Sequence, residues 1–233
     1  MRYIKLSALV FVALLFKQSF ETSNAELLPQ KVLVESNENS FNFSALAPDI
    51  KLLEEAAQSG DAVAQTELGQ LLWREADDQE QIKESIQWFE KAANQGELEA
   101  QFWLGLLTLG KRQDALDWLV SAAEQGHTGA AYFAGENLLS GLKVERDEAL
   151  GSRLMIQAAR EGQAMASFQL AQFYFGKGDH ESAFLWSIIT SYSLPDIGKI
   201  FIDLSAPHIP SDRKAIIKEK AQFCSQTGYV SCQ

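Results

Sequence analysis

Apolar side chains between residues 50 and 193 recur at the three- and four-residue spacing of helices that bury one face. The run of Ile82, Ile86, Phe89 and Ala93 is one example. A glycine follows such runs, and the next helical run begins one or two residues later. The pattern predicts an all-α chain whose helices pack side by side and are joined by short corners.

One string of residues recurs four times within this region. The copies are AAQSGDAVAQTELG, AANQGELEAQFWLG, AAEQGHTGAAYFAG and AAREGQAMASFQLA, beginning at residues 56, 92, 122 and 158. Successive copies therefore start 36, 30 and 36 residues apart. A period in this range is typical of a solenoid, in which one pair of helices cannot bury its apolar face alone and stacks on the next pair.

Three columns of small residues recur in the copies. Gly60 and its equivalents follow a helical run, where a left-handed residue ends a helix. Gly69 and its equivalents fall inside the next helix, where glycine costs about 1 kcal/mol relative to alanine. We expect a neighbouring helix to approach closely at this second column and at a column of alanines five residues before it. The columns are Gly60, Gly96, Gly126 and Gly162; Gly69, Gly105, Gly135 and Ala171; and Ala64, Ala100, Ala130 and Ala166.

The repeated string resembles the Sel1-like repeat, a relative of the tetratricopeptide repeat. The family pattern is roughly Ala-Ala-x-x-Gly-x-x-x-Ala-Gln-x-x-Leu-Gly, and Gln65 and Gln101 match its glutamine, whereas Ala131 and Ser167 depart from it. The resemblance implies an α/α superhelical solenoid of about four helix-turn-helix repeats over residues 45–193. In each repeat it implies a helix A that lines a concave face, followed by a helix B.

The first 25 residues have the order of basic, apolar and small residues that export signals have. The apolar run Leu6–Phe16 is too short to span a bilayer, which takes about 20 residues. We expect a signal peptide at 1–25 that is cleaved after Ala25, with an uncleaved anchor or a buried helix as the alternatives. The mature chain is then expected to be periplasmic or secreted, without stable membrane insertion, and to begin with an extended or disordered lead-in at 26–44.

Both ends of the repeat region carry segments that we expect to shield it. Asp49–Ser59 has the pattern of a helix B from a lost first repeat. Pro195 is expected to end the last repeat helix, and residues 194–233 are expected to form capping helices. One of them is predicted from Ser211 through Phe223, with Ser211 as its cap. Its inward residues are predicted to be Ile216, Ile217 and Ala221.

Two cysteines lie near the carboxyl terminus, Cys224 and Cys232. In an exported protein, two cysteines this close in sequence are expected to form a disulfide, here a clasp on the last helix. A redox or metal site is the alternative, although no CxxC motif or histidine cluster accompanies the pair.

The net charge of −11 makes the chain a poor candidate for binding nucleic acid or anionic lipid. The sequence holds no motif of a metalloprotease, a serine hydrolase or a phosphate-binding loop. Its histidines, His127, His180 and His208, are far apart in sequence, and His180 is interpreted as a solvated helix start. The acidic stretch 75–80 is expected to start a helix, with a calcium loop as the alternative. We therefore expect no catalytic residue, no metal and no cofactor.

Two aromatic residues stand where the Sel1-like family commonly has a polar residue. Trp103 and Phe133 occupy this position in neighbouring repeats, just before the Leu-Gly pair of the pattern. They are predicted to form an apolar floor for a partner helix or peptide, with Glu136 and Gln172 as a polar rim. Ordinary packing between adjacent repeats is the alternative interpretation.

The resemblance implies a protein that holds other proteins together, and it implies no single reaction. We predict a non-enzymatic scaffold or regulatory adaptor in the bacterial cell envelope, with a partner polypeptide on the concave face. The alternative is an envelope hydrolase or β-lactam-binding protein like the disulfide-rich Sel1 relatives. Those relatives carry a cysteine pair in every repeat, whereas this chain has one pair in its tail. A place in a flagellar motor ring is a narrower hypothesis of the scaffold kind.

Overall fold

The computed structural model describes the backbone of residues 43–227 and the side chains of residues 50–227. Within this range the chain is all-helical, with eleven α-helices, one 3-10 turn and no strand, so the predicted fold class is confirmed. The predicted signal peptide at 1–25, nearly all of the lead-in at 26–44, and Cys232 lie outside the described residues.

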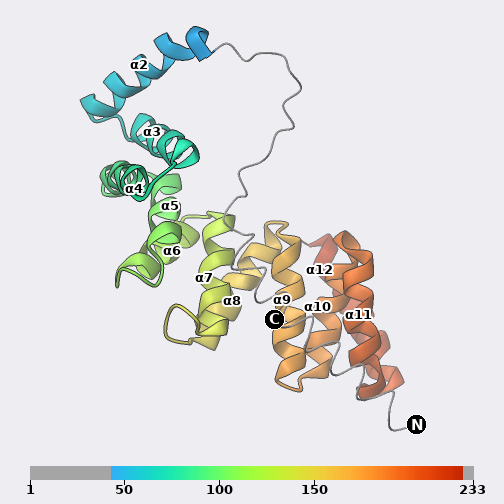
Figure 1. Ribbon diagram of the computed structural model, residues 1–233. Coiled ribbons are helices and arrows are strands. Elements are labelled where there is room, and N and C mark those ends of the chain that lie inside the picture. The colour runs from blue at the N-terminus through green and yellow to red at the C-terminus, as the bar shows by residue number, and fades with distance from the viewer. Residues whose placement is uncertain (1–42, 228–233) are drawn as a thin grey trace. The chain divides into compact units, whose positions relative to one another are not determined.

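The helices alternate between two classes, and from α3 to α11 consecutive helices pack against each other (Figure 1). An A helix contains the second half of the repeated string, and a B helix leads to the next corner glycine. The pairs α3–α4, α5–α6, α7–α8 and α9–α10 are the four repeats. The A helices are α3 (Ala62–Glu75), α5 (Leu98–Thr108), α7 (Thr128–Ser140) and α9 (Ala164–Gly176); the B helices are α2 (Phe43–Ser59), α4 (Gln79–Ala93), α6 (Ala115–Glu124), α8 (Glu148–Arg160) and α10 (His180–Ser193).

The helix α2 begins at Phe43, earlier than the expected start at Asp49. Its C-terminal part takes the place of a B helix before α3, because Ala57 is buried with Ala64 in one apolar cluster. Gln65 donates a hydrogen bond from Nε2 to the carbonyl oxygen of Ala57 at 3.0 Å. Gln65 thus ties α3 to the end of α2, the helix that precedes it.

The four corner glycines adopt the left-handed conformation that the sequence predicts. Their φ angles lie between 88° and 102°, and a Cβ at any of them would meet no heavy atom within 4 Å. Backbone conformation, rather than lack of space, therefore requires glycine at these corners. The next helix starts at once, and Asp61, Glu97 and His127 each cap it by accepting a hydrogen bond from the N–H three residues later.

The second column of small residues lies where A and B helices approach each other closely. A Cβ at Gly69 would be 2.9 Å from Phe89 Cε1, and one at Gly135 would be 2.9 Å from Met155 Cγ. Because real Cβ atoms essentially never come within 3.0 Å of another heavy atom, the predicted close approach is confirmed. The alanine column is also buried, as expected, with Ala100, Ala130 and Ala166 fully so.

Three further elements pack around α10 at the carboxyl end of the repeats: α11 (Pro195–Ser205), η1 (Ala206–His208) and α12 (Ser211–Gln226). Every side chain of α10 from Ala183 to Thr190 is buried as a result. Gly198 on α11 permits the contact, since a Cβ there would lie 2.5 Å from the backbone nitrogen of Ser191. Pro195 starts α11, where its missing N–H leaves no hydrogen bond unmade.

The helix α12 corrects two details of the sequence interpretation. Ile216 is 52% exposed, whereas Ile217 is 6% and Ala221 0% exposed, so Ile216 does not point inward. Adjacent residues of a helix differ by about 100° in direction, and the buried stripe of Ile217, Ala221 and Cys224 follows the four- and three-residue spacing. Ser211 is the first residue of the helix rather than its cap, a position that Pro210 takes.

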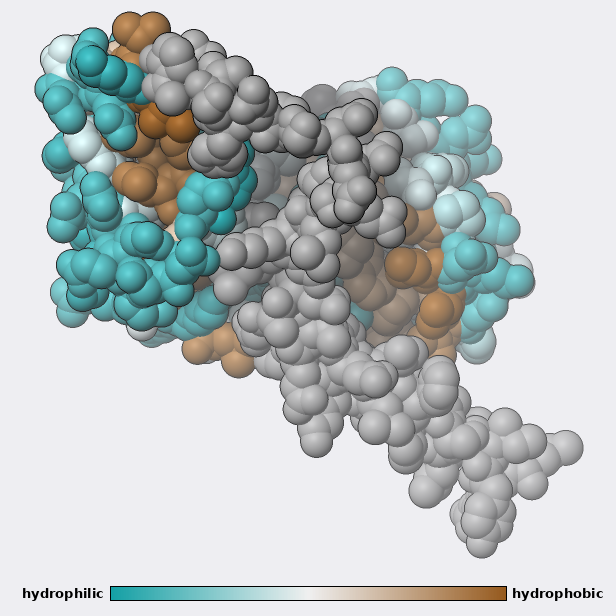
Figure 2. Space-filling view, turned by 45° about the horizontal axis from the view of Figure 1, so that its top comes forward, coloured by the Kyte–Doolittle hydropathy of each residue, from teal (hydrophilic) through white to brown (hydrophobic). Residues whose placement is uncertain are grey.

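None of the helices described is long and apolar enough to cross a membrane. The face drawn in Figure 2 is largely hydrophilic where residues are described, and hydrophobic residues gather in smaller patches between hydrophilic ones. Exposed large apolar side chains include Val63, Met165, Ile216 and Phe223.

Candidate functional site

The four residues predicted to bind a partner lie on three successive A helices, on one side of each. Positions four and seven residues apart share a side of a helix, and in each A helix three such positions are exposed or half-buried. We name these twelve positions the A-helix face. They are Val63, Glu67 and Gln70 on α3; Glu99, Trp103 and Leu106 on α5; Gly129, Phe133 and Glu136 on α7; and Met165, Gln169 and Gln172 on α9.

Trp103 is half-buried among aromatic rings of the preceding repeat. Its ring stacks on Phe89 with 5.8 Å between centroids and lies 5.0 Å from the ring of Trp73. Its Nε1 donates a hydrogen bond to Glu99 Oε1 at 2.8 Å. Packing between repeats therefore holds this indole in one orientation, and part of it stays exposed on the A-helix face.

Phe133 is the equivalent residue one repeat later, and it is also half-buried. The ring of Phe102 links the two positions, since its centroid lies 5.7 Å from that of Trp103 and 6.0 Å from that of Phe133. Tyr132 contacts Phe133 edge to face at 5.4 Å. The aromatic side chains of α5 and α7 thus form one continuous group, although their assignment to partner binding stays a prediction.

A carboxylate at Glu99 joins three A helices. Its Oε1 accepts hydrogen bonds from Trp103 and, at 3.4 Å, from Nε2 of Gln70 on α3, while its Oε2 lies 3.0 Å from Nε2 of His127 at the start of α7. The backbone N–H of Ala130 donates to His127 Nδ1, so His127 Nε2 carries the proton and donates to Glu99. The hydrogen bond from His127 lowers the pKa of Glu99, although burial opposes it.

Glu136 occupies a less polar environment than Glu99. Its Oε1 accepts a hydrogen bond from Gln169 Nε2 at 2.9 Å, and the same nitrogen donates to the hydroxyl of Tyr132 at 2.7 Å. Burial raises the pKa of Glu136, and the hydrogen bond from Gln169 and the charge of Lys143 oppose that shift. Burial also raises the pKa of Tyr132. Gln172 lies three residues after Gln169 and is half-buried at the edge of this cluster.

Sequence reasoning missed the hydrogen bonds that connect successive A helices. The sequence carried a signal only for the cap that His127 forms on its own helix, because His127 stands in the same column as Asp61 and Glu97, where a helix needs a side-chain acceptor. The partner of His127 could not be read in the same way, since Glu99 belongs to the preceding repeat.

His180 starts α10, as interpreted from the sequence, but the expectation that its side chain is solvated is wrong. Its ring is half-buried, stacks on His208 with 4.1 Å between centroids, and lies 5.4 Å from the ring of Phe175. Its Nδ1 is buried and accepts or donates no hydrogen bond within the described residues. The turn η1 brings His208 back to the start of α10, and the local sequence carries no signal of that return.

The acidic stretch 75–80 and Cys224, the other candidates from the sequence, lie in surroundings that suit a role in the fold. Asp78, within the acidic stretch, caps α4 by accepting from the N–H groups of Glu80 and Gln81, as expected for a helix start. Residues 50–227 contain no group of three or more side chains suited to holding a metal. Cys224 is fully buried, and its predicted disulfide with Cys232 stays a prediction because Cys232 lies outside the described residues.

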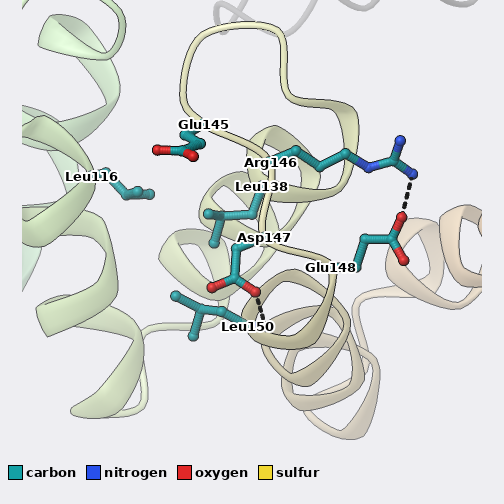
Figure 3. A pocket seen from close by; sticks show the side chains of 7 residues that line it. All are labelled: Leu116, Leu138, Glu145, Arg146, Asp147, Glu148 and Leu150. Carbon is teal, nitrogen blue, oxygen red and sulfur yellow. Dashed lines mark hydrogen bonds and ion pairs between the residues drawn. The ribbon is translucent and has the colours of Figure 1, made fainter.

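An open cavity of about 460 Å³ lies between α6 and the loop that joins α7 to α8 (Figure 3). Asp147 caps α8 through the N–H of Leu150 at 3.0 Å, and Glu148 pairs with Arg146 at 2.8 Å. These polar groups therefore support the fold, and the lining holds no hydroxyl, thiol or imidazole nucleophile. The lining residues are Leu116, Leu138, Glu145, Arg146, Asp147, Glu148 and Leu150.

Comparisons with known proteins agree with the repeat architecture. The Sel1 repeat matches residues 62–97, 98–127 and 128–163, so each match spans one A helix and the B helix that follows it. The pair α9–α10 lies beyond the matched residues. It follows the corner glycine Gly162 and has the same order of helices, but Leu194 and Pro195, rather than a glycine, follow α10. A search of curated proteins finds no match.

Two solved structures have the same fold. A protective antigen of uropathogenic Escherichia coli, which displays an SLR fold, is 26% identical with a TM-score of 0.60 over 76% of this chain, and the chain spans 40% of that protein. A Sel1 repeat protein from Oxalobacter formigenes is 26% identical to this chain with a TM-score of 0.54. The match covers 75% of this chain and 78% of the Oxalobacter protein. Sel1 repeats are typically protein-interaction scaffolds, and most are not enzymes. The repeated strings, the helix pairs and these matches together show that the chain carries Sel1 repeats, which the family model matches over residues 62–163.

Proposed function

We propose that this protein is a non-enzymatic scaffold or adaptor of the bacterial cell envelope that holds a partner polypeptide on the A-helix face. The envelope location rests on the amino-terminal sequence, with its basic start, short apolar run and small residues before Glu26. The binding role rests on the Sel1 repeats and on the properties of this face.

One observation carries the proposal: Trp103 and Phe133 stay partly exposed while packing and hydrogen bonds fix their positions. Aromatic anchors contribute most of the energy in many protein interfaces. A ring that is already held in one orientation loses little conformational entropy when a partner covers it. The fold alone does not require a large aromatic residue here, since the equivalent positions in the other two repeats are Glu67 and Gln169.

The face is also stiffened between repeats, which favours recognition of an extended partner. Hydrogen bonds connect α3 to α5 through Gln70 and Glu99, α5 to α7 through Glu99 and His127, and α7 to α9 through Glu136 and Gln169. A surface whose elements keep their spacing presents the same contacts in the free and bound states.

The test is capture of the partner from the periplasm of the source organism by the full-length protein, after crosslinking in living cells. We expect Trp103→Ala with Phe133→Ala to reduce capture at least tenfold. Ile216→Ala with Phe223→Ala removes similar apolar groups from the exposed side of α12 and should leave capture unchanged. Equal capture by both double variants would reject the A-helix face as the binding surface.

Because Trp103 and Phe133 also pack between repeats, a second variant separates binding from folding. Glu67→Lys and Met165→Lys change exposed positions at the two ends of the same face. Both should keep native helical circular dichroism and still reduce capture. Subcellular fractionation and amino-terminal sequencing test the location, with Glu26 expected as the first residue of the mature protein.

A further inference from the structure

The charges of the A-helix face are all of one sign. Its twelve positions include the carboxylates of Glu67, Glu99 and Glu136 and contain neither lysine nor arginine. Arg74 is the single basic residue of the four A helices, and it lies at the end of α3 beside Glu75. The charge of Lys143, in the loop after α7, acts on Glu136 from outside these twelve positions. A partner that covers this face buries its carboxylates, and positive charge on the partner offsets the cost of that burial.

The carboxylates of Glu99 and Glu136 differ in how many hydrogen bonds the fold gives them. Both oxygens of Glu99 accept hydrogen bonds, from Gln70, Trp103 and His127. Glu136 accepts one, at Oε1 from Gln169, and its Oε2 accepts none within the described residues. A half-buried carboxylate with an oxygen to spare has capacity for a charge-assisted hydrogen bond from outside.

An aromatic ring accompanies this carboxylate on the same side of the same helix. Phe133 precedes Glu136 by three residues, a spacing at which side chains of a helix are neighbours. Lysine and arginine carry an apolar stem below a charged head, so one residue can lay its stem over a phenyl ring and direct its head to a carboxylate. The pair therefore fits a basic side chain better than a purely apolar or an acidic one.

We infer that the partner segment held on the A-helix face is basic, and that Glu136 receives the head of a lysine or arginine whose stem covers Phe133. A neighbouring apolar side chain of the same segment packs on Trp103. This inference rests on the proposed function and adds to it the chemistry of the occupant. It excludes a segment rich in aspartate or glutamate, which three carboxylates on the face would repel.

An unbiased selection tests the inference without knowledge of the natural partner. A random twelve-residue peptide library displayed on phage is selected on the immobilised full-length protein and, in parallel, on Glu136→Gln. On the wild-type protein we expect enrichment of peptides that place lysine or arginine next to an aromatic or aliphatic residue. On Glu136→Gln the enrichment of basic residues should disappear.

The affinity of one selected peptide then measures the contact directly. We expect Glu136→Gln to weaken the peptide about tenfold, and replacement of its basic residue by citrulline or norleucine to weaken it equally, with no further loss in the combination. Glu145→Gln removes the same charge from the loop after α7, off the A-helix face, and should change the affinity less than twofold.

The outcomes distinguish this inference from the proposed function. Selected peptides that lack basic residues, or that bind Glu136→Gln as tightly as the wild type, overturn the inference. If they nevertheless depend on Trp103 and Phe133, the A-helix face is still the binding surface. Peptides that bind Trp103→Ala with Phe133→Ala at full affinity contradict both.

Discussion

Gly105 on α5 approaches the backbone of Ala115 on α6 so closely that a Cβ at Gly105 would lie 2.8 Å from the carbonyl oxygen of Ala115 and 2.7 Å from Leu119 Cγ. The carbonyl oxygen belongs to the first residue of α6, which cannot move without displacing the helix. A glycine inside α5 therefore has a tertiary cause, and its effect on stability can be measured.

We predict that Gly105→Ala lowers the free energy of unfolding by about 1 to 3 kcal/mol, because overpacking outweighs the gain of about 1 kcal/mol in helix propensity. Urea unfolding followed by circular dichroism measures the change. Gly176→Ala is the matched control, since a Cβ at the last residue of α9 meets no heavy atom within 4 Å. A Gly105→Ala variant as stable as the wild type would contradict the close approach.

His127 is expected to stabilise the repeats in two separable ways. His127→Ala removes both the cap of α7 and the hydrogen bond to Glu99, and it should cost about 1 to 3 kcal/mol of unfolding free energy. His127→Asn restores a cap but not the link to Glu99, so it should recover part of the loss. If His127→Asn recovers all of it in urea unfolding, the link between α5 and α7 contributes nothing.

Glu136 should make stability depend on pH in a defined direction. Burial raises its pKa above the ordinary value of 4.5, so the folded state favours the protonated carboxyl. The stabilisation is complete below pH about 4.5 and is lost as pH rises through the elevated pKa of the folded state. Lys143 opposes the shift, and Tyr132 stays neutral across this range because its own pKa is raised.

The measurement for this prediction is the difference in urea midpoint between wild type and Glu136→Gln at several pH values from 4 to 8. Wild type should lose stability relative to Glu136→Gln as pH increases. A constant difference, or one of opposite sign, would show that the folded protein does not favour the protonated form. In the presence of a bound basic peptide the affinity should instead rise with pH, because binding requires the ionised carboxylate.

The stacked histidines should hold the carboxyl-terminal helices against the repeats. His208→Ala removes the ring that covers His180, and amide hydrogen exchange in α12 should become faster while α3 to α8 stay unchanged. His208→Phe keeps an aromatic ring and should preserve slow exchange. Equal exchange rates in His208→Ala and wild type would mean that other contacts, such as Arg213 with Glu181, hold α12 by themselves.

The fold could be predicted from the sequence because its determinants are small residues at fixed positions. Gly60 indicates a corner between helices, and Gly69 indicates a close approach of two helices. Both glycines recur with the period of the repeat. The phase of α12 could not be predicted, because Ile216 and Ile217 are equally apolar and a single copy offers no period to choose between them.

The candidate site was less accessible to sequence reasoning. Trp103 and Phe133 stand out in the sequence as departures from a family pattern. In the structure the ring of Phe102 contacts both of them. The contacts of Glu99, by contrast, join residues about thirty positions apart in both directions along the chain. Nothing local distinguishes this glutamate from Glu67, which is solvent-exposed.

The sharing of one carboxylate by α3, α5 and α7 affects how the protein comes apart. In most repeat proteins each unit contacts only its immediate neighbours, so a chain can fray from an end one unit at a time. Glu99 belongs to the middle one of three neighbouring units: loss of α3 removes its donor Gln70, and loss of α7 removes its donor His127. Thermal unfolding that starts at either end of the repeats therefore reaches units around Glu99 that unfold together. Force applied along the chain should unfold these units in a single step.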